Sequence, residues 1–234
     1  MKSTIVILCI LVSLSMGLVF NKDKDFSNIP DVEEVVRFDM AGINFVVDQT
    51  HAFSHNALKQ SFTTFNGNIP AFDVVVNFTS GAYLHYNNLT GECSFGEVPK
   101  LNLTEYFIEF VTNYIEFAGT RGEHLTLYEI KYPGNEGART WLYGLYVPNE
   151  TGEYTFYPSR FQSHLPNQEN GDYDGEWIDT QSFPQLSAAD FDYPQCNQAN
   201  SKKLDTKFTY QALGIDSDFL SEIMKEATYI KTSE

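Results

Sequence analysis

The sequence predicts an α+β protein that is mainly antiparallel β, with one central helix and one C-terminal helix. Its 234 residues include 14 Tyr and 19 Phe, a content that favours strands over a helical bundle. Short apolar and aromatic runs alternate with clusters of Pro, Gly and Asn, which is typical of antiparallel hairpins. Two segments, 103–118 and 217–229, instead place apolar residues at helical spacing.

The first 17 residues have the features of a secretory signal peptide. Lys2 provides the basic start, Ile5–Leu14 the apolar core and residues 15–17 small side chains for cleavage. The alternative is an uncleaved anchor, but the apolar run is shorter than the roughly 20 residues of a membrane span. No later stretch is apolar enough to span a membrane, so we expect a secreted chain.

We divide the remainder into a flexible lead at 18–31, a β-rich domain at 32–196, and a linker with an amphipathic helical tail at 197–234. In the first half of the domain, β-branched and aromatic runs predict strands, and Asn66-Gly67-Asn68 is a strong hairpin signal. These expected strands cover residues 32–38, 43–48, 60–65, 71–78, 82–86 and 92–95.

Residues 103–118 are the predicted central helix. Phe107 and Phe110 belong to its apolar stripe. Asn102 followed by Glu105 resembles a capping box, and Gly119 is a suitable stop. The high content of aromatic and β-branched residues leaves strands open as an alternative here.

Residues 124–132, 139–147 and 153–161 are expected to form a three-stranded antiparallel meander, because the links between them are too short for parallel crossovers. Both faces of this meander are apolar or aromatic, so something other than water should cover each. Two packed layers would do so. The alternative is a cavity for an apolar ligand between sheet and helix, with Tyr hydroxyls at its mouth. Our candidate pocket residues are Trp141, Tyr143, Leu145, Tyr128, Ile130, Phe107 and Phe110.

After the meander the chain becomes polar. We expect a long exposed loop at 166–175, and then a return of Trp177 and Ile178 to the core surface. Residues 191–196 form a closing segment. The tail helix is expected to dock on the domain or to bind a partner.

Two cysteines remain once the signal peptide is removed. In an oxidising compartment Cys93 and Cys196 are expected to form one disulfide, and two free buried thiols are the alternative. The secretory context also gives weight to four N-glycosylation motifs. Their acceptor residues are Asn77, Asn88, Asn102 and Asn149.

A formal charge of −16 argues against binding of nucleic acid or anionic membranes. Calcium is the candidate cation, because Asp172, Asp174 and Glu176 alternate in an acidic stretch and calcium prefers oxygen ligands. A solvated acidic loop without a metal is the alternative. His51 and His55, four residues apart, would suit a metal only on a helix.

No catalytic motif is present: the chain has no nucleophile elbow, zinc helix or phosphate-binding glycine loop. We therefore expect a protein that is not an enzyme and needs no cofactor. A hydrolase with residues assembled from distant segments is the alternative, because geometry rather than sequence order defines such sites.

Residues 32–196 resemble the ependymin-related proteins, whose fold is shared with LolA-like lipoprotein carriers. The resemblance rests on an order of features: a signal peptide, β-hairpins, the 82–86 strand leading to Cys93, a helix, the aromatic meander and the closing Phe-Asp-Tyr-Pro-Gln-Cys at 191–196. It implies a strongly curved sheet, or two stacked sheets, around an apolar pocket. It also implies carriage of hydrophobic ligands, with calcium association and matrix or lysosomal settings.

The leading hypothesis is therefore a secreted N-glycosylated protein that binds a lipid or other hydrophobic molecule between sheet and helix. The alternative is a calcium-associated adhesion or matrix protein without a ligand cavity. An extracellular location is expected, with a lysosomal or other endomembrane lumen as the alternative. Homodimer formation stays open.

Overall fold

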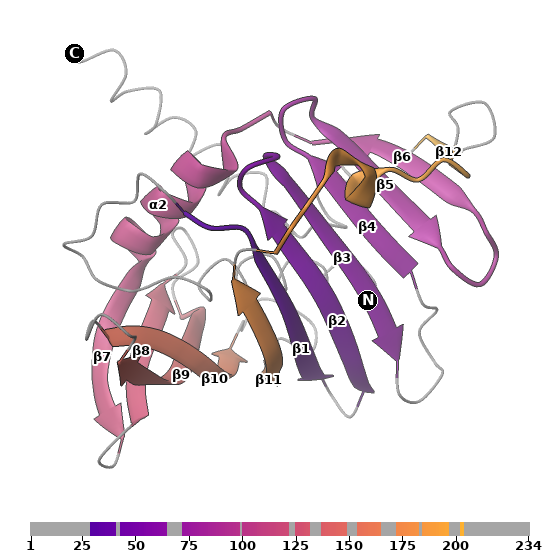
Figure 1. Ribbon diagram of the computed structural model, residues 1–234. Helices are drawn as coiled ribbons and strands as arrows, with labels where there is room; N and C mark the ends of the chain where they lie inside the picture. The colour runs from indigo at the N-terminus through magenta and orange to yellow at the C-terminus, as the bar shows by residue number, and fades with distance from the viewer. Residues whose placement is uncertain are drawn as a thin grey trace, which may run out of the picture.

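The computed structural model shows one large open sheet and one α-helix in the part of the chain that it describes (Figure 1). Described are residues 29–40, 43–64, 72–98, 100–121, 125–131, 137–148, 154–164, 172–182, 184–196 and 202–203.

The first six strands are consecutive neighbours in the sheet, as are β7 to β11. The strands before the helix are β1 (Val32–Met40), β2 (Ile43–Ala52), β3 (Ala57–Thr64), β4 (Phe72–Asn77), β5 (Ala82–Asn87) and β6 (Cys93–Glu97). The helix is α2 (Leu103–Tyr114). After it come β7 (Ile115–Arg121), β8 (Leu125–Lys131), β9 (Arg139–Pro148), β10 (Tyr154–His164), β11 (Asp172–Ser182), the 3₁₀ turn η2 (Ala188–Phe191) and β12 (Lys202–Lys203).

The predicted fold class, a curved sheet or two stacked sheets with two helices, is corrected by the described residues, which form one open sheet and one α-helix. The structure has a single 12-stranded sheet in the order β12-β6-β5-β4-β3-β2-β1-β11-β10-β9-β8-β7. β1 pairs antiparallel with β2 on one side and with β11 on the other, so the two meanders join edge to edge instead of stacking. Among the described strands, β12 alone pairs parallel, with β6. The expected helix at 217–229 lies outside the described residues.

The predicted loop at 166–175 is also wrong in its second half, because β11 begins at Asp172. Asp and Gly disfavour strands, which is why the sequence suggested a loop. Each acidic residue at this end of β11 instead pairs with a basic side chain on a neighbouring strand. Opposite charges across a strand pair stabilise a sheet that single-residue preferences would not predict.

The central helix begins where the sequence predicts it and ends four residues early. Asn102 caps it, since its Oδ1 accepts hydrogen bonds from the backbone N–H groups of Thr104 (3.0 Å) and Glu105 (3.2 Å). From Ile115 the chain continues as β7. The alternative of strands therefore holds for the last part of the predicted segment, where β7 gains the ladder of β8.

We call the side of the sheet that carries α2 the helix face and the opposite side the outer face. The helix face is defined by apolar side chains that form one buried cluster with the stripe of α2. They are Val36, Phe38, Val47, Phe53, Leu58, Phe62, Val74, Val76, Tyr83, Tyr128, Ile130, Leu142, Phe156 and Phe161 from the strands and the segment after β2, and Leu103, Phe107, Phe110 and Val111 from α2.

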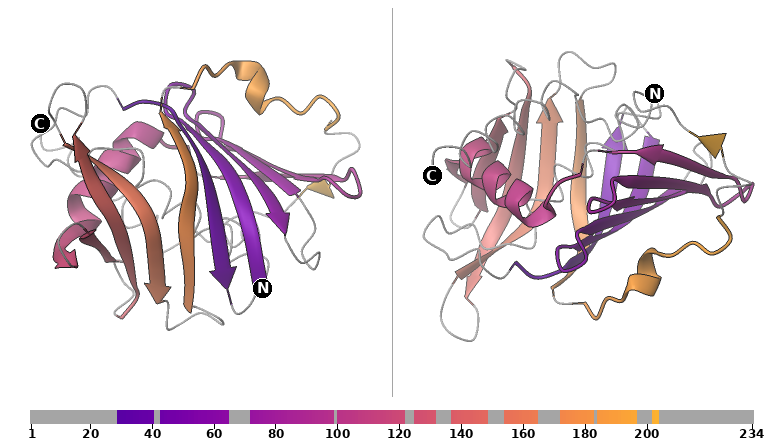
Figure 2. Two further views of the ribbon diagram at one scale, coloured as in Figure 1. Left: turned by 60° about the horizontal axis from the view of Figure 1, so that its bottom comes forward. Right: turned by 90° about the horizontal axis from the view of Figure 1, so that it is seen from above.

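The outer face of β4 to β6 is covered by residues 184–196, which cross it on the side away from α2 (Figure 2). Phe191 and Tyr193 pack there against a second small core. A disulfide between Cys93 of β6 and Cys196 holds this segment in place. The predicted cysteine pairing is therefore supported, and its partners lie 103 residues apart in the chain.

Two glycines make room for aromatic rings on the helix face. A Cβ atom at Gly144 would lie 2.5 Å from the ring of Phe156, and one at Gly175 would lie 2.3 Å from the ring of Phe161. Real Cβ contacts are longer, so larger residues at either position would displace a buried ring. Each ring lies over the backbone of the adjacent strand.

Candidate functional site

Four polar side chains lie together on the mainly apolar helix face. Glu34 on β1, Gln49 and His51 on β2, and Gln60 on β3 are each no more than 2% exposed. Glu34 is paired with Gln49 across the strands, and Gln49 with Gln60. Alternation along each strand places all four on the side of Val36 and the other apolar residues of this face. We call these four residues, together with Trp177 of β11, the polar cluster.

A chain of hydrogen bonds runs through the middle of the cluster. Gln60 Nε2 donates to Gln49 Oε1 (3.3 Å), and Gln49 Nε2 donates to Glu34 Oε2 (3.1 Å). This chain uses both ends of the Gln49 amide and one end each of Gln60 and Glu34. It leaves the two outermost oxygens, Glu34 Oε1 and Gln60 Oε1, without a hydrogen-bond partner.

Both ring nitrogens of His51 also have no partner. Nε1 of Trp177 makes no hydrogen bond of normal geometry, but it lies close enough to the Glu34 carboxyl group to lower the pKa of that group. His51 Nε2 lies 4.0 Å from Glu34 Oε2, too far for a hydrogen bond. Buried polar atoms are normally satisfied, because an unpaired one costs about 1–3 kcal/mol. By contrast, the buried hydroxyls of Thr140 and Ser163, also on this face, bond each other at 2.5 Å.

Burial governs the protonation of the cluster. Removal from water raises the pKa of Glu34 well above its usual value, although the hydrogen bond from Gln49 and the nearby Trp177 indole partly oppose the rise. Removal from water also lowers the pKa of His51 to about 3. Both shifts favour the uncharged forms. Glu34 and His51, whose Oε2 and Nε2 atoms are 4.0 Å apart, are therefore a neutral pair and not an ion pair.

Two groups of aromatic rings, which together we call the aromatic row, lie on the helix face between the sheet edge at β7 and the cluster. At the edge, Phe117 contacts Tyr128 with ring centres 6.0 Å apart, and Tyr128 contacts Phe156 at 5.1 Å. Further in, Phe161 contacts Trp177 of the cluster at 5.1 Å. Five strand spacings separate β7 from β1, or roughly 24 Å.

This row is exposed to solvent at its β7 end. Phe117 is 62% exposed although it lies on the helix face, and β7 is the last strand of the sheet. The hydroxyls of Tyr128 and Tyr146 contact each other beside it. Burial and this contact raise the pKa of Tyr128 above its usual range. Two Tyr hydroxyls thus lie near the β7 edge of the helix face, and a ligand cavity beside them stays a prediction.

The structure does not bring the seven predicted pocket residues together. Phe107 and Phe110 of α2 and Tyr128 and Ile130 of β8 are buried on the helix face. The three residues predicted from β9 point to the other side of the sheet: they are Trp141, Tyr143 and Leu145. The sequence showed that both meander faces were apolar, but not which of them the helix covers.

The three predicted calcium ligands lie along β11, and each has a cationic or titratable partner. Asp172 Oδ1 lies 2.6 Å from His164 Nδ1, Asp174 Oδ2 lies 2.7 Å from an Arg160 nitrogen, and Glu176 Oε1 lies 2.9 Å from one of Arg37. Within the described ranges, no three His, Cys, Asp or Glu residues are grouped closely enough to hold a metal ion. Calcium binding stays a prediction.

The other predicted positions are dispersed. His51 belongs to the polar cluster, whereas the ring of His55 lies beside Phe191, which covers the outer face. Of the glycosylation acceptors, Asn77, Asn88 and Asn102 are exposed. Asn149 lies outside the described residues. Glycosylation itself stays a prediction.

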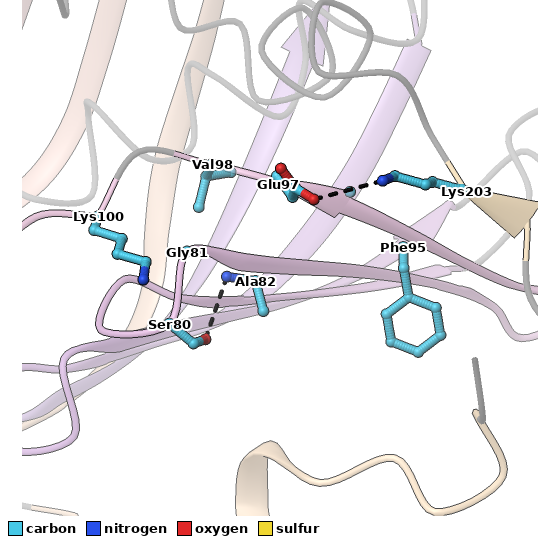
Figure 3. A pocket seen from close by; sticks show the side chains of 9 residues that line it. Ser80, Gly81, Ala82, Phe95, Glu97, Val98, Lys100 and Lys203 are labelled. Atoms are coloured by element: carbon cyan, nitrogen blue, oxygen red, sulfur yellow. Dashed lines mark hydrogen bonds and ion pairs between the residues drawn. The ribbon is translucent and has the colours of Figure 1, made fainter.

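A separate cavity of about 600 Å³ lies at the opposite end of the sheet, beside β5, β6 and β12 (Figure 3). Two ammonium groups line it, and one of them, on Lys203, is 3.6 Å from the carboxylate of Glu97. Gly81 is required at its wall: its φ is +74°, and a Cβ there would lie 2.7 Å from the Val98 carbonyl oxygen. This mixed, largely charge-compensated lining is unlike the apolar pocket that we expected.

The sequence carried a signal for the polar cluster that our prediction missed. Each member occupies the place of an apolar residue in a period-two pattern: Glu34 lies between Val32 and Val36, and Gln60 between Leu58 and Phe62. A polar residue at an inward position usually changes the free energy of folding, because the hydrogen bonds that it makes with water in the unfolded chain must be replaced. For His51, the spacing to His55 suggests only a metal ligand.

No family model matches the sequence, and no curated protein matches it. The resemblance to ependymin-related proteins is thus not supported. Solved structures do match the fold. One is an uncharacterized conserved protein from Thermus thermophilus, with 13% identity over 77% of this chain and 92% of that chain, and a TM-score of 0.47.

Two further solved structures cover more of the chain at lower scores. A DUF1329 family protein from Desulfovibrio piger has 9% identity over 82% of this chain and 98% of its own, with a TM-score of 0.36. A LolA superfamily protein from Nitrosomonas europaea has 8% identity over 84% of this chain and 100% of its own, with a TM-score of 0.38. The likeness concerns the fold only, and at these scores it carries no argument about function.

Among the described residues, no helix has the length and apolar character needed to cross a membrane.

Proposed function

We propose that this protein is a secreted carrier that binds a hydrophobic molecule along the helix face of its sheet. The observation that carries the proposal is the polar cluster, whose unsatisfied buried atoms lie within an extensive apolar face. Ligand sites for small molecules have this composition: they are mostly apolar, with a few polar groups that fix orientation.

The proportions of the fold support the proposal. Twelve strands at about 4.8 Å spacing give a sheet roughly 50 Å across. The 12 residues of α2 make a helix about 18 Å long, so α2 alone does not account for the burial of the whole face. The solvent-exposed Phe117 marks the β7 edge as the entrance to the aromatic row.

The proposal is tested on mature protein secreted from a eukaryotic host. Its organic extract is analysed by mass spectrometry, and binding of a fluorescent long-chain lipid is titrated after the extraction. We expect a stoichiometric hydrophobic compound in the extract and saturable binding of the probe. An empty extract together with no saturable binding would refute the proposal.

A pair of variants locates the site. Phe117→Glu places a charge on an exposed position at the proposed entrance and should weaken probe binding at least tenfold. Tyr157→Glu makes a matched change on the outer face, where Tyr157 is 50% exposed, and should leave binding unchanged. Equal effects of both substitutions would place the ligand elsewhere. Glycosylation is checked on the same material by the loss of mass on enzymatic deglycosylation.

A further inference from the structure

The polar cluster is built to accept and donate hydrogen bonds without carrying charge. The chain from Gln60 through Gln49 to Glu34 fixes the orientation of both amides, because Gln49 uses its oxygen and its nitrogen in the chain and Gln60 uses its nitrogen. Its free ends are Gln60 Oε1, which can only accept, and Glu34 Oε1. A carboxyl group is a donor when protonated and an acceptor when ionised.

The remaining unsatisfied atoms supply the complementary capacity. Trp177 Nε1 can only donate. Neutral His51 offers one donor and one acceptor nitrogen. A hydroxyl group, which donates one hydrogen bond and accepts others, matches this mixture; a methyl group or an ether oxygen does not.

Within the described strands, no cationic side chain lies beside the cluster to pair with an anionic ligand. Among the described residues of the neighbouring strands, Arg37 and Lys59 point to the outer face, where Arg37 contacts Glu176 and Lys59 donates to the Asp190 carbonyl oxygen. The helix-face positions on β1, β2, β3 and β11 around the cluster are otherwise apolar or uncharged. A buried charge without a partner is costly, so an ionised carboxylate or phosphate head is disfavoured.

The aromatic row supplies the apolar half of the ligand site. It ends at Trp177, whose ring contacts Phe161 on one side and whose Nε1 belongs to the cluster. An aliphatic or ring-containing tail along the row would therefore place its polar end at the unsatisfied atoms. This arrangement fits an amphipathic molecule with a single polar group at one end.

We infer that the polar cluster binds the uncharged hydroxyl group of an amphipathic ligand, such as a long-chain alcohol or a sterol-like alcohol. This inference rests on the proposed function, since it names the chemistry of the same ligand. In the inferred complex, Trp177 Nε1, which lies beside Glu34, donates to the hydroxyl oxygen, and the hydroxyl donates to a nitrogen of His51, whose ring is 4.0 Å from the same carboxyl group.

The test compares four probes with the same 16-carbon chain: the alcohol, its methyl ether, the carboxylic acid and the primary amine. Each is titrated by calorimetry against delipidated full-length mature protein at pH 7.5. We expect the alcohol to bind about tenfold or more tightly than the methyl ether, because the ether leaves acceptors of the cluster unpaired. The ionised acid and amine should bind more weakly than the alcohol.

Two matched variants assign the preference to the cluster. Trp177→Phe keeps an aromatic ring and removes only the Nε1 donor, so the preference for alcohol over ether should fall to about threefold or less. Trp141→Phe makes the same change on the outer face and should keep the full preference. Near-ultraviolet circular dichroism and the urea midpoint verify that each variant is folded.

The outcomes separate the two proposals. Equal binding of alcohol and ether by the wild-type protein would overturn the inference. It would mean that ordered water, and not a ligand hydroxyl, satisfies the polar atoms of the cluster. The carrier proposal would still stand. Tighter binding of the acid or amine would also overturn it. No binding of any probe would overturn both. The wild-type series decides among these outcomes even if a variant fails to fold.

Discussion

Replacement of the buried carboxyl group of Glu34 by an amide should stabilise the protein increasingly as the pH rises. Glu34 is 1% exposed, and burial raises its pKa well above 4.5. At a pH between the unfolded and folded pKa values, the unfolded chain binds fewer protons at this position than the folded protein. Stability contributed by Glu34 is therefore lost as the pH rises through this window.

The magnitude follows from linkage. One proton of difference changes the free energy of unfolding by about 1.4 kcal/mol per pH unit. Glu34→Gln keeps the shape of the side chain and does not titrate. The variant should therefore gain about 1.4 kcal/mol over the wild type for each pH unit above about 4.5. The gain levels off at the folded pKa of Glu34, so the height of the plateau measures the shift.

His51 adds an opposite dependence that both proteins share. Its pKa falls from about 6.5 to about 3 in the folded protein, so the unfolded state binds more protons in that window. Stability from His51 is lost as the pH falls, by roughly 5 kcal/mol in total. Because both proteins keep His51, this contribution cancels in their difference.

The assay is urea unfolding followed by tryptophan fluorescence at half-unit steps from pH 4 to pH 9. Glu33→Gln, adjacent on the same strand but on the outer face, controls for the loss of one negative charge. The reasoning is refuted if Glu34→Gln is less stable than the wild type at neutral pH and recovers toward pH 4. That result would mean that Glu34 and His51 form a buried ion pair, which the amide would break.

Three further predictions concern the packing of the sheet and helix. Gly144→Val should lower the free energy of unfolding by about 3 kcal/mol, because the new Cβ would clash with the Phe156 ring and the Tyr157 carbonyl oxygen of β10. As a control in the same urea titration, Leu145→Ala on the outer face should change the free energy of unfolding by about 0.5 kcal/mol or less. Cys196→Ser should cost about 4–5 kcal/mol, because the Cys93 disulfide closes a loop of 103 residues, and an unchanged midpoint in the presence of a reductant would contradict this. Asn102→Ala should lower the thermal midpoint through the loss of about 1 kcal/mol of capping energy, whereas Asn102→Asp, which removes the glycosylation motif but keeps the capping oxygen, should not.

The local rules identified most strands and the start of the helix. Alternating runs such as Ala82–Tyr86, and the three strands of the meander, lie within strands of the structure. The capping residue Asn102 was predicted because its side chain acts within one turn. These features depend on neighbours a few residues away, so the sequence shows them directly.

The sequence did not predict that β11 begins as early as Asp172, and the reason is specific. Asp172–Glu176 has the composition of a loop when it is considered alone. It forms a strand because β10 and β1 lie on either side and supply Arg160 and Arg37 as charge partners. Arg160 and Arg37 are not close to Asp172–Glu176 in the sequence, so no local pattern indicates that they pair with these residues.

The sequence alone determined the period of each strand, the cysteine pair and the excess of apolar side chains on both sides of the meander. Only the tertiary structure decided that β1 joins β11 in a single sheet, which side of that sheet the helix covers, and that Glu34, His51, Gln60 and Trp177 meet on it. The reason is physical: alternation fixes which side chains share a face of one strand, but the pairing of distant strands fixes which faces become one surface.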